Sequence, residues 1–267
     1  MFSMMSSRER FARRHTVYIP AKRAIYTYIP KNGCTTLRFS IAVANGRPDN
    51  PETAEYIHAG MPQMVASNRD LANCDYAFIV LRCPYRRIAS AFLDKAVGDL
   101  LRAATLFPRQ RRIFGRSKPD TSEAGLAATR AKVMALTFAD FADLLQNCNS
   151  KSLDHHFRPQ TEFLLNRDYD DYFALEQLAE AEIKLRAKID FRLVDKGGHG
   201  ISKRNKSDVD ASKLTIAGLL ALLDAGFAPS YQSLFTETSR RAVETFYAAD
   251  LALYKKHFGA NDLLFPS

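Results

Sequence analysis

Residues 24–36 read AIYTYIPKNGCTT, and this stretch decides the fold. Its first six residues are nearly all β-branched or aromatic, which predicts a buried strand that ends at Pro30. Pro30 and Gly33 are typical of a loop. The hydroxyl group of Thr35 or Thr36 can then cap a helix whose apolar residues recur at helical spacing. The stretch therefore predicts a strand, a loop and a helix in direct succession.

A second unit of the same kind is residues 76–92, YAFIVLRCPYRRIASAF. Its first six residues are almost wholly apolar, the pattern of a central strand covered on both faces, and Pro84 suits the first position of a helix. We also expect a short strand over residues 171–175, a helix from about 177 to 188 and a C-terminal helix from about 238 to 257. Strands that alternate with helices predict an α/β fold with a central, mainly parallel sheet flanked by helices.

Composition is that of a globular protein, with 46% hydrophobic and 25% charged residues among 267. We expect a single domain over residues 23–267, preceded by an N-terminal extension of residues 1–22. The extension has basic residues but no apolar run, and no stretch reaches the length of a membrane-spanning helix, so we expect a cytoplasmic protein. The four cysteines lack zinc-site spacing.

The charge balance favours a polyanionic partner. Lys and Arg exceed Asp and Glu by 38 − 29 = 9. The partner could be nucleic acid, an acidic membrane surface, an acidic glycan or a phosphorylated nucleotide, and charge alone does not choose among them.

The loop of residues 31–36, KNGCTT, is suited to binding phosphate. Backbone N–H groups at a helix N-terminus carry partial positive charge and stabilise an anion. Gly33 allows close approach of the backbone and Lys31 adds a full charge, although the lysine leads the segment instead of ending it as in a Walker A loop. An ordinary capped turn is the alternative. The candidate nucleotide-binding residues here are Lys31, Asn32, Gly33, Cys34, Thr35 and Thr36.

Arg82 follows the second strand directly. Buried charge is costly unless it is paired, and ligands of open α/β sheets bind at the carboxyl ends of strands, so Arg82 is a second candidate anion ligand. Ser90, on the next helix, could donate to the same anion. The alternative is that Arg82 pairs with an internal carboxylate.

Together these segments resemble the sulfotransferases that use PAPS (3′-phosphoadenosine 5′-phosphosulfate). Residues 30–37 are similar to the family's 5′-phosphosulfate loop and residues 82–92 to its 3′-phosphate motif. Residues 154–160, DHHFRPQ, and 247–254, YAADLALY, resemble segments of the carbohydrate branch that includes the chondroitin 4-sulfating enzymes. The resemblance spans residues 25–258.

The resemblance implies a three-layer fold like that of P-loop NTPases, PAPS as co-substrate, no metal, and a hydroxylated acceptor on a saccharide or glycolipid. Lys31 would stabilise the leaving phosphate oxygen, while Arg82 and Ser90 would hold the 3′-phosphate. Thr35 and Thr36 would bind the 5′-phosphate. The sequence departs from the family at Cys83, where Asp or Glu is usual, and we expect that side chain to support the loop.

The acceptor hydroxyl must lose a proton, so a general base is expected. His58 is the first candidate and His156 the second; Glu55 or Glu162 could serve instead. The adjacent pair of histidines at 155 and 156 could suggest a metal, but adjacent side chains rarely point at one ion, and no metal site is expected.

Two basic segments have two interpretations each. Residues 196–207 could fold over PAPS, with Arg204 or Lys206 near the 3′-phosphate, or form a solvated loop. Residues 109–118 could contact an acidic acceptor or only solvent.

Two other functions compete. A phosphotransferase on a related α/β scaffold should have an acidic, metal-holding residue after the second strand, where Arg82 stands instead. A nucleic-acid-binding protein fits the charge, but no recognisable nucleic-acid module occurs. We therefore expect no nucleic-acid partner, while peripheral contact with a membrane surface stays open.

Overall fold

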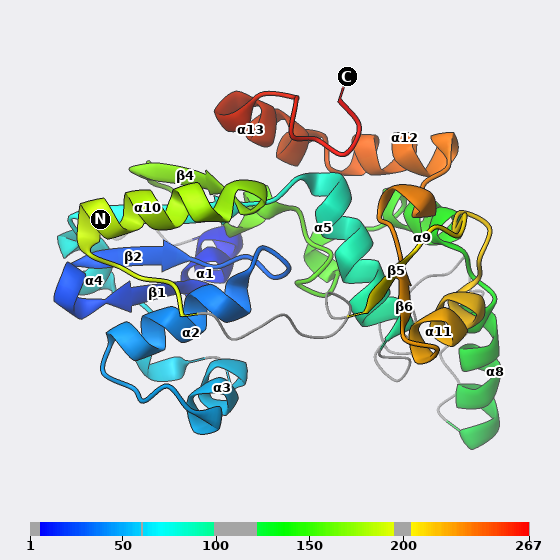
Figure 1. Ribbon diagram of the computed structural model, residues 1–267, viewed down its shortest axis with the longest axis horizontal. Coiled ribbons are helices and arrows are strands. Elements are labelled where there is room, and N and C mark those ends of the chain that lie inside the picture. Colours follow the sequence, from blue (N-terminus) through cyan, green and yellow to red (C-terminus); the bar gives the residue numbers. More distant parts are fainter. Residues whose placement is uncertain (1–5, 60, 99–121, 195–203, 267) are drawn as a thin grey trace. The chain divides into compact units, whose positions relative to one another are not determined.

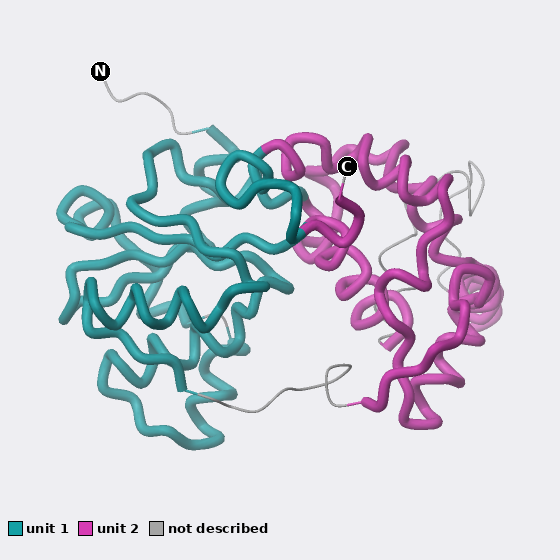
Figure 2. The backbone as a smooth tube through the Cα atoms, turned by 45° about the horizontal axis from the view of Figure 1, so that its top comes forward, with its two compact units in different colours: residues 1–83, 159–197, 253–262 teal, residues 84–158, 198–252, 263–267 magenta. Residues whose placement is uncertain are grey.

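The structure, a computed structural model, describes residues 6–59, 61–98, 122–194 and 204–266. The chain divides into two compact units, coloured separately in Figure 2. Unit 1 comprises residues 1–83, 159–197 and 253–262, and unit 2 comprises residues 84–158, 198–252 and 263–267. A single domain over residues 23–267 stays a prediction.

Unit 1 is built on a four-stranded sheet (Figure 1). Its strands, in spatial order, are β1 (Thr16–Ile19), β2 (Ala24–Thr27), β3 (Tyr76–Leu81) and β4 (Asp171–Ala174). β1 is antiparallel to β2, whereas β2, β3 and β4 are parallel to one another. The mixed α/β class with a central, mainly parallel sheet is therefore confirmed.

The edge strand β1 lies inside the stretch 1–22 that we expected to precede the domain. Thr16 pairs with Thr27 and Ile19 with Ala24, so a tight connection folds β1 back on β2. The sheet thus begins before residue 23.

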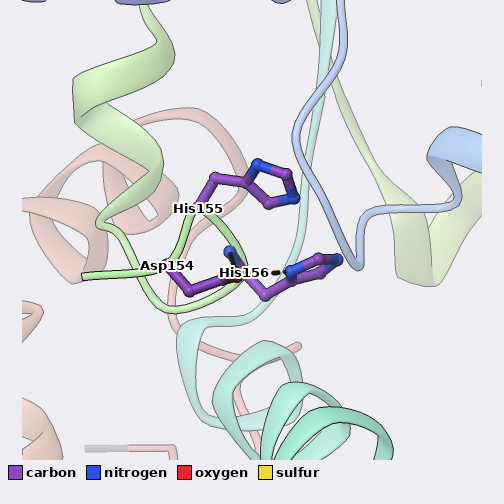
Figure 3. Close-up of side chains that lie close together, drawn as sticks. All are labelled: Asp154, His155 and His156. Atoms are coloured by element: carbon purple, nitrogen blue, oxygen red, sulfur yellow. Dashed lines mark hydrogen bonds and ion pairs between the residues drawn. The ribbon is translucent and has the colours of Figure 1, made fainter. Parts of the chain in front are cut away.

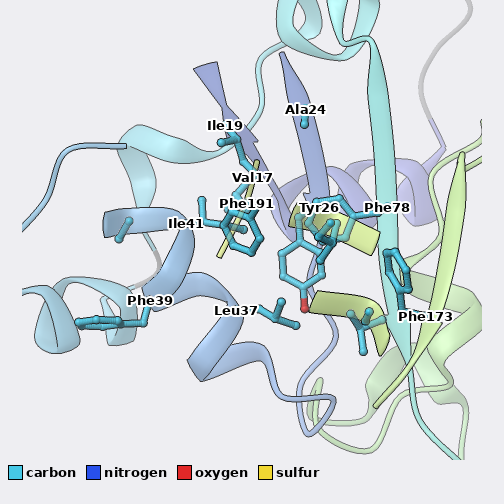
Figure 4. Close-up of a cluster of buried hydrophobic side chains, with 14 of the residues drawn as sticks. Val17, Ile19, Ala24, Tyr26, Leu37, Phe39, Ile41, Phe78, Phe173 and Phe191 are labelled. Carbon is cyan, nitrogen blue, oxygen red and sulfur yellow. The ribbon is translucent and has the colours of Figure 1, made fainter. Parts of the chain in front are cut away.

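One face of the sheet carries the aromatic side chains of the core. Tyr26, Phe78 and Phe173 lie on three neighbouring strands, and the rings of Tyr26 and Phe78 stack with centroids 5.0 Å apart (Figure 4). Leu37 and Leu185 pack against this cluster from helices. The helices that contribute to it are α2 (Cys34–Ala44), α3 (Pro51–His58) and α10 (Leu178–Ile189).

The opposite face combines polar contacts with further helices. The Thr27 hydroxyl lies 3.0 Å from that of Thr16 and 2.8 Å from that of Tyr169. Tyr172 stacks on His257, with ring centroids 3.7 Å apart. These contacts bring in α1 (Ser7–Arg14) at the N-terminus of β1 and α13 (Ala248–Phe258). Helices therefore flank the sheet.

Short elements complete unit 1. They are α4 (Asn68–Asn73) and the 3-10 turns Pro20–Lys22, Pro62–Met64, Gln160–Phe163 and Leu175–Gln177. The strand predicted at 171–175 and the helix predicted at 177–188 are β4 and α10 and so are confirmed.

Unit 2 is mainly helical, with aromatic rings at its centre. Phe92 contacts Phe138 and Phe141, at centroid distances of 5.1 and 5.0 Å. The helices among its described residues include α5 (Pro84–Ala91), the π-helix Phe92–Val97, α8 (Glu123–Met134), α9 (Phe138–Gln146), α11 (Ile216–Asp224) and α12 (Glu237–Phe246). The described part of unit 2 also contains two short parallel strands, β5 (Asn205–Ser207) and β6 (Phe227–Pro229), and the 3-10 turns Ser150–Ser152 and Gln232–Leu234.

The prediction of one continuous C-terminal helix over residues 238–257 is wrong. The segment forms α12 and α13, separated at Tyr247, whose φ of −103° and ψ of 25° end the first helix. The apolar periodicity runs on across the break, so the sequence pattern does not reveal it. Among the helices described, none is both long and apolar enough to cross a membrane.

Candidate active site

Three loops leave one edge of the sheet in unit 1. Because β2, β3 and β4 are parallel, their carboxyl ends lie at the same edge. Lys31 follows β2, Arg82 follows β3 and Glu176 follows β4. This is the edge at which open α/β sheets bind ligands.

The first loop turns through two residues with left-handed backbone. Lys31 has φ 73° and Gly33 has φ 70°. Gly33 precedes α2, and a Cβ atom there would lie 2.8 Å from Cδ1 of Leu175. The left-handed backbone at residue 33 favours glycine, and a Cβ atom there would displace the Leu175 side chain.

The prediction that Thr35 or Thr36 caps the helix is wrong, because α2 already begins at Cys34 and its N-cap is Gly33. No side chain caps this end, and the first helical bond runs from the Leu37 N–H to the Gly33 carbonyl (3.1 Å). The N–H groups of residues 34–36 precede that bond and belong to the positive end of the helix dipole. The first turn of α2, half-buried, therefore suits an anion.

The second loop contacts the first through Arg82. The Arg82 guanidinium donates to the Lys31 carbonyl oxygen at 2.8 Å. Two segments 51 positions apart in sequence, each proposed to bind an anion, are thus joined at one sheet edge.

The side-chain amides of Asn32 and Gln160 connect the two loops by hydrogen bonds. Asn32 is fully buried, and its Nδ2 donates to the Val80 carbonyl (2.9 Å) and to Oε1 of Gln160 (2.6 Å). Oε1 of Gln160 also accepts from the Arg82 N–H (3.0 Å), and its Nε2 donates to the Arg82 carbonyl (2.9 Å). The side-chain amide of Asn32 is therefore used to hold the loop.

Glu176 supports the residue at which the sequence departs from the family pattern. Its Oε1 accepts from the Cys83 N–H and its Oε2 from the Tyr254 hydroxyl, both at 3.1 Å. Burial and the neighbouring Glu176 charge raise the pKa of Tyr254. Sequence reasoning missed Glu176 and its contact with Tyr254, because the partners of Glu176 lie 78 or more positions away.

His58 is the exposed last residue of α3. Arg38 of α2 donates to the carbonyl of the preceding Ile57 and, through Nε, to Sδ of Met61 at 3.3 Å. Arg38 thereby ties the segment around His58 to the helix that follows Lys31.

In unit 2, Asp154 and His156 form a hydrogen-bonded pair (Figure 3). Asp154 Oδ1 lies 2.6 Å from the ring Nδ1 of His156 and accepts from its backbone N–H at 2.9 Å. Burial works to raise the pKa of Asp154, but the hydrogen bonds from His156 and the charges of His155 and His156 outweigh it, so the pKa is lowered. An ionised Asp154 fixes the proton of neutral His156 on Nδ1, which makes Nε2 the basic nitrogen.

His155 completes a group of three potential metal ligands. One ligand atom from each of Asp154, His155 and His156 lies within 4.8 Å of the others. The Nδ1 atom of His156 is already bonded to the Asp154 carboxylate, and the absence of a metal stays a prediction.

The remaining predicted residues also belong to unit 2. Ser90 is buried near the end of α5, three residues after the fully buried Arg87, which donates to the Arg158 carbonyl at 2.8 Å. Nε of Arg204 donates to the Leu223 carbonyl at the end of α11 (2.9 Å), and Lys206 is exposed on β5. The basic run 109–118 and the first part of the loop, 196–203, lie outside the described residues.

A family model described as the sulfotransferase family matches residues 14–257. No curated protein and no solved structure matches the chain.

Proposed function

The chain belongs to the sulfotransferase family, and from this premise we propose that it transfers a sulfuryl group from PAPS to a carbohydrate hydroxyl and releases PAP (adenosine 3′,5′-bisphosphate). The observation that carries this proposal is the bond from the Arg82 guanidinium to the Lys31 carbonyl, which joins the two predicted nucleotide loops. The resemblance to the carbohydrate branch, including the chondroitin 4-sulfating enzymes, supports the acceptor class.

The loop after β2 would hold the 5′ end of the nucleotide. The uncapped first turn of α2 offers N–H groups to the 5′-phosphate, and the hydroxyls of Thr35 and Thr36 add donors. Lys31 would stabilise the negative charge that develops on the phosphate oxygen as the bond from sulfur to that oxygen breaks.

The loop after β3 would hold the 3′-phosphate through Arg82, since a guanidinium can donate two parallel hydrogen bonds to a phosphate. Ser90, and Arg204 or Lys206, stay proposed partners of the same phosphate. A sheet with anion loops at its carboxyl edge is also what the proposed P-loop-NTPase-like, three-layer fold requires.

His156 is the better supported general base. As the acceptor oxygen bonds to sulfur, its proton would pass to Nε2 of His156, while Asp154 stabilises the resulting imidazolium. His58 shows no comparable bond to a carboxylate among the contacts of the described residues, so it stays the second candidate.

The proposal needs no metal, nucleic acid or membrane span; a cytoplasmic location and peripheral contact with a membrane stay predictions. Against a phosphotransferase, the residue that follows β3 is Arg82 and not an acidic metal ligand. Against a nucleic-acid-binding protein, the family match covers residues 14–257.

The test is a screen of saccharide, glycolipid and small hydroxylated acceptors with PAPS labelled in its sulfuryl group. Wild type should label at least one acceptor, and Lys31→Ala should lower turnover about 1,000-fold while PAP affinity changes less than about tenfold, because the ammonium acts on charge that develops in the transition state. Lys22→Ala, which removes an exposed contact with Asp190 in the same unit, is the matched control. Retained turnover in Lys31→Ala would show that the role given to Lys31 is wrong.

A further inference from the structure

Gln160 occupies a central position at the sheet edge, although nothing in its side-chain chemistry is reactive. It is buried, with a relative exposure of 1%, and begins the 3-10 turn after Pro159. Its amide bonds to Asn32 of the first loop and to both backbone groups of Arg82 of the second. One side chain therefore contacts both proposed anion-binding segments.

The bonding pattern uses both ends of the amide. Oε1 accepts from Nδ2 of Asn32 (2.6 Å) and from the Arg82 N–H (3.0 Å), while Nε2 donates to the Arg82 carbonyl (2.9 Å). A glutamate would lack the donor, and a methionine of similar size would lack both functions. Among residues of this length, only glutamine makes all three bonds.

The bonds from Gln160 fix the backbone of Arg82, from which its side chain extends. The Arg82 peptide N–H and carbonyl are both held by Gln160, and Asn32 also bonds directly to Val80 at the end of β3. The Arg82 guanidinium in turn donates to the Lys31 carbonyl. The separation between the Lys31 loop and Arg82 is thus set before any ligand arrives.

A fixed separation has a consequence for ligand choice. A ligand with two anionic groups at the matching distance gains both contacts without ordering the loops, whereas a ligand with one anionic group gains little from the bracing. We propose that Gln160 is a positioning residue that makes the site select adenine nucleotides carrying phosphate at both the 3′ and the 5′ position. This inference rests on the proposed function, because it assumes that the two loops bind the two ends of PAPS.

The test compares the affinities of PAP and adenosine 5′-monophosphate by calorimetry. Gln160→Met should weaken PAP binding about tenfold and 5′-monophosphate binding less than about twofold, since two of the three lost bonds hold the backbone of Arg82, the residue proposed for the 3′-phosphate that the monophosphate lacks. The ratio of the two affinities therefore falls about fivefold or more. Gln63→Met, an exposed glutamine of the same unit that accepts from Arg47, is the matched control and should keep the wild-type ratio.

Equal losses for both nucleotides in Gln160→Met, or an unchanged ratio, would reduce Gln160 to a structural residue and overturn the inference. Should Gln160→Met fail to fold, Asn32→Ser removes the bond between Asn32 and Gln160 from the side of the first loop. The ratio of the PAP and 5′-monophosphate affinities of that variant then decides the question in the same way. Absence of PAP binding by wild type would instead remove the proposed function itself. The two failures are thereby distinguishable.

Discussion

The loops at the sheet edge of unit 1 and the Asp154–His156 turn of unit 2 both contain residues proposed for catalysis, yet they are built differently. At the sheet edge, the cationic residues Lys31 and Arg82 lie on loops whose backbone is held by hydrogen bonds from neutral side-chain amides. In the turn, a carboxylate bonds directly to an imidazole. The first arrangement suits an anion that must be held in place, and the second suits a proton that must be moved.

The largest effect expected of a change outside the sheet edge concerns the Asp154–His156 turn. Asp154→Asn should lower kcat about 100-fold, because the amide no longer stabilises the imidazolium or fixes the tautomer of His156. His58→Ala should change kcat less than about twofold under the same assignment. Steady-state kinetics of both variants at saturating substrate, across a pH series, measure kcat. A large loss in His58→Ala with little change in Asp154→Asn would instead assign the general base to His58 of α3.

A smaller effect tests the rigidity of the first arrangement. Gly33→Ala should lower the free energy of unfolding by about 2 kcal/mol or more, through left-handed strain and the contact with Leu175 Cδ1 at 2.8 Å. Gly46→Ala is the control, since Gly46 also has positive φ (88°) but no atom within 4 Å of the added Cβ. Denaturant titration compares the two, and equal losses would contradict the claim that the loop is tightly packed against Leu175.

The smallest effect is a fall in stability at alkaline pH, caused by Tyr169, which bonds to the strand that precedes the Lys31 loop. Burial raises the pKa of Tyr169, which bonds to Thr27 of β2, to about 12. A folded-state pKa above the unfolded value means that this contribution is complete below about pH 10 and is lost as pH rises towards 12. Wild type should therefore lose stability more steeply than Tyr169→Phe between pH 10 and 12 in thermal melts; parallel curves would contradict the assignment.

Local patterns sufficed for much of the fold. The apolar runs predicted β2, β3 and β4, and the loops after the first two followed from proline and glycine. β1 escaped because its assignment depends on antiparallel pairing with β2, which the residues Thr16–Ile19 alone do not reveal. The helix start at Cys34 escaped because threonine is a good cap in isolation, while the left-handed turn at Lys31 and Gly33 is set by packing.

Some residues of the candidate site could likewise be proposed from local patterns, and others could not. Lys31 and Arg82 could be proposed from their positions after strands, since the carboxyl edge of a parallel sheet is a general binding location. The tasks of Asn32, Gln160 and Glu176 could not, because each depends on a partner far away in the sequence. The Asp154–His156 bond is local, and its spacing of two residues was a usable signal.

The most direct test of the central claim is calorimetric binding of PAP to wild type and to Arg82→Ala. If the two loops together hold one bisphosphate nucleotide, wild type binds PAP and Arg82→Ala binds it about 100-fold more weakly, because a charge-assisted contact and the brace on Lys31 are both lost. Equal affinity in the two proteins, or no binding by either, would contradict the account.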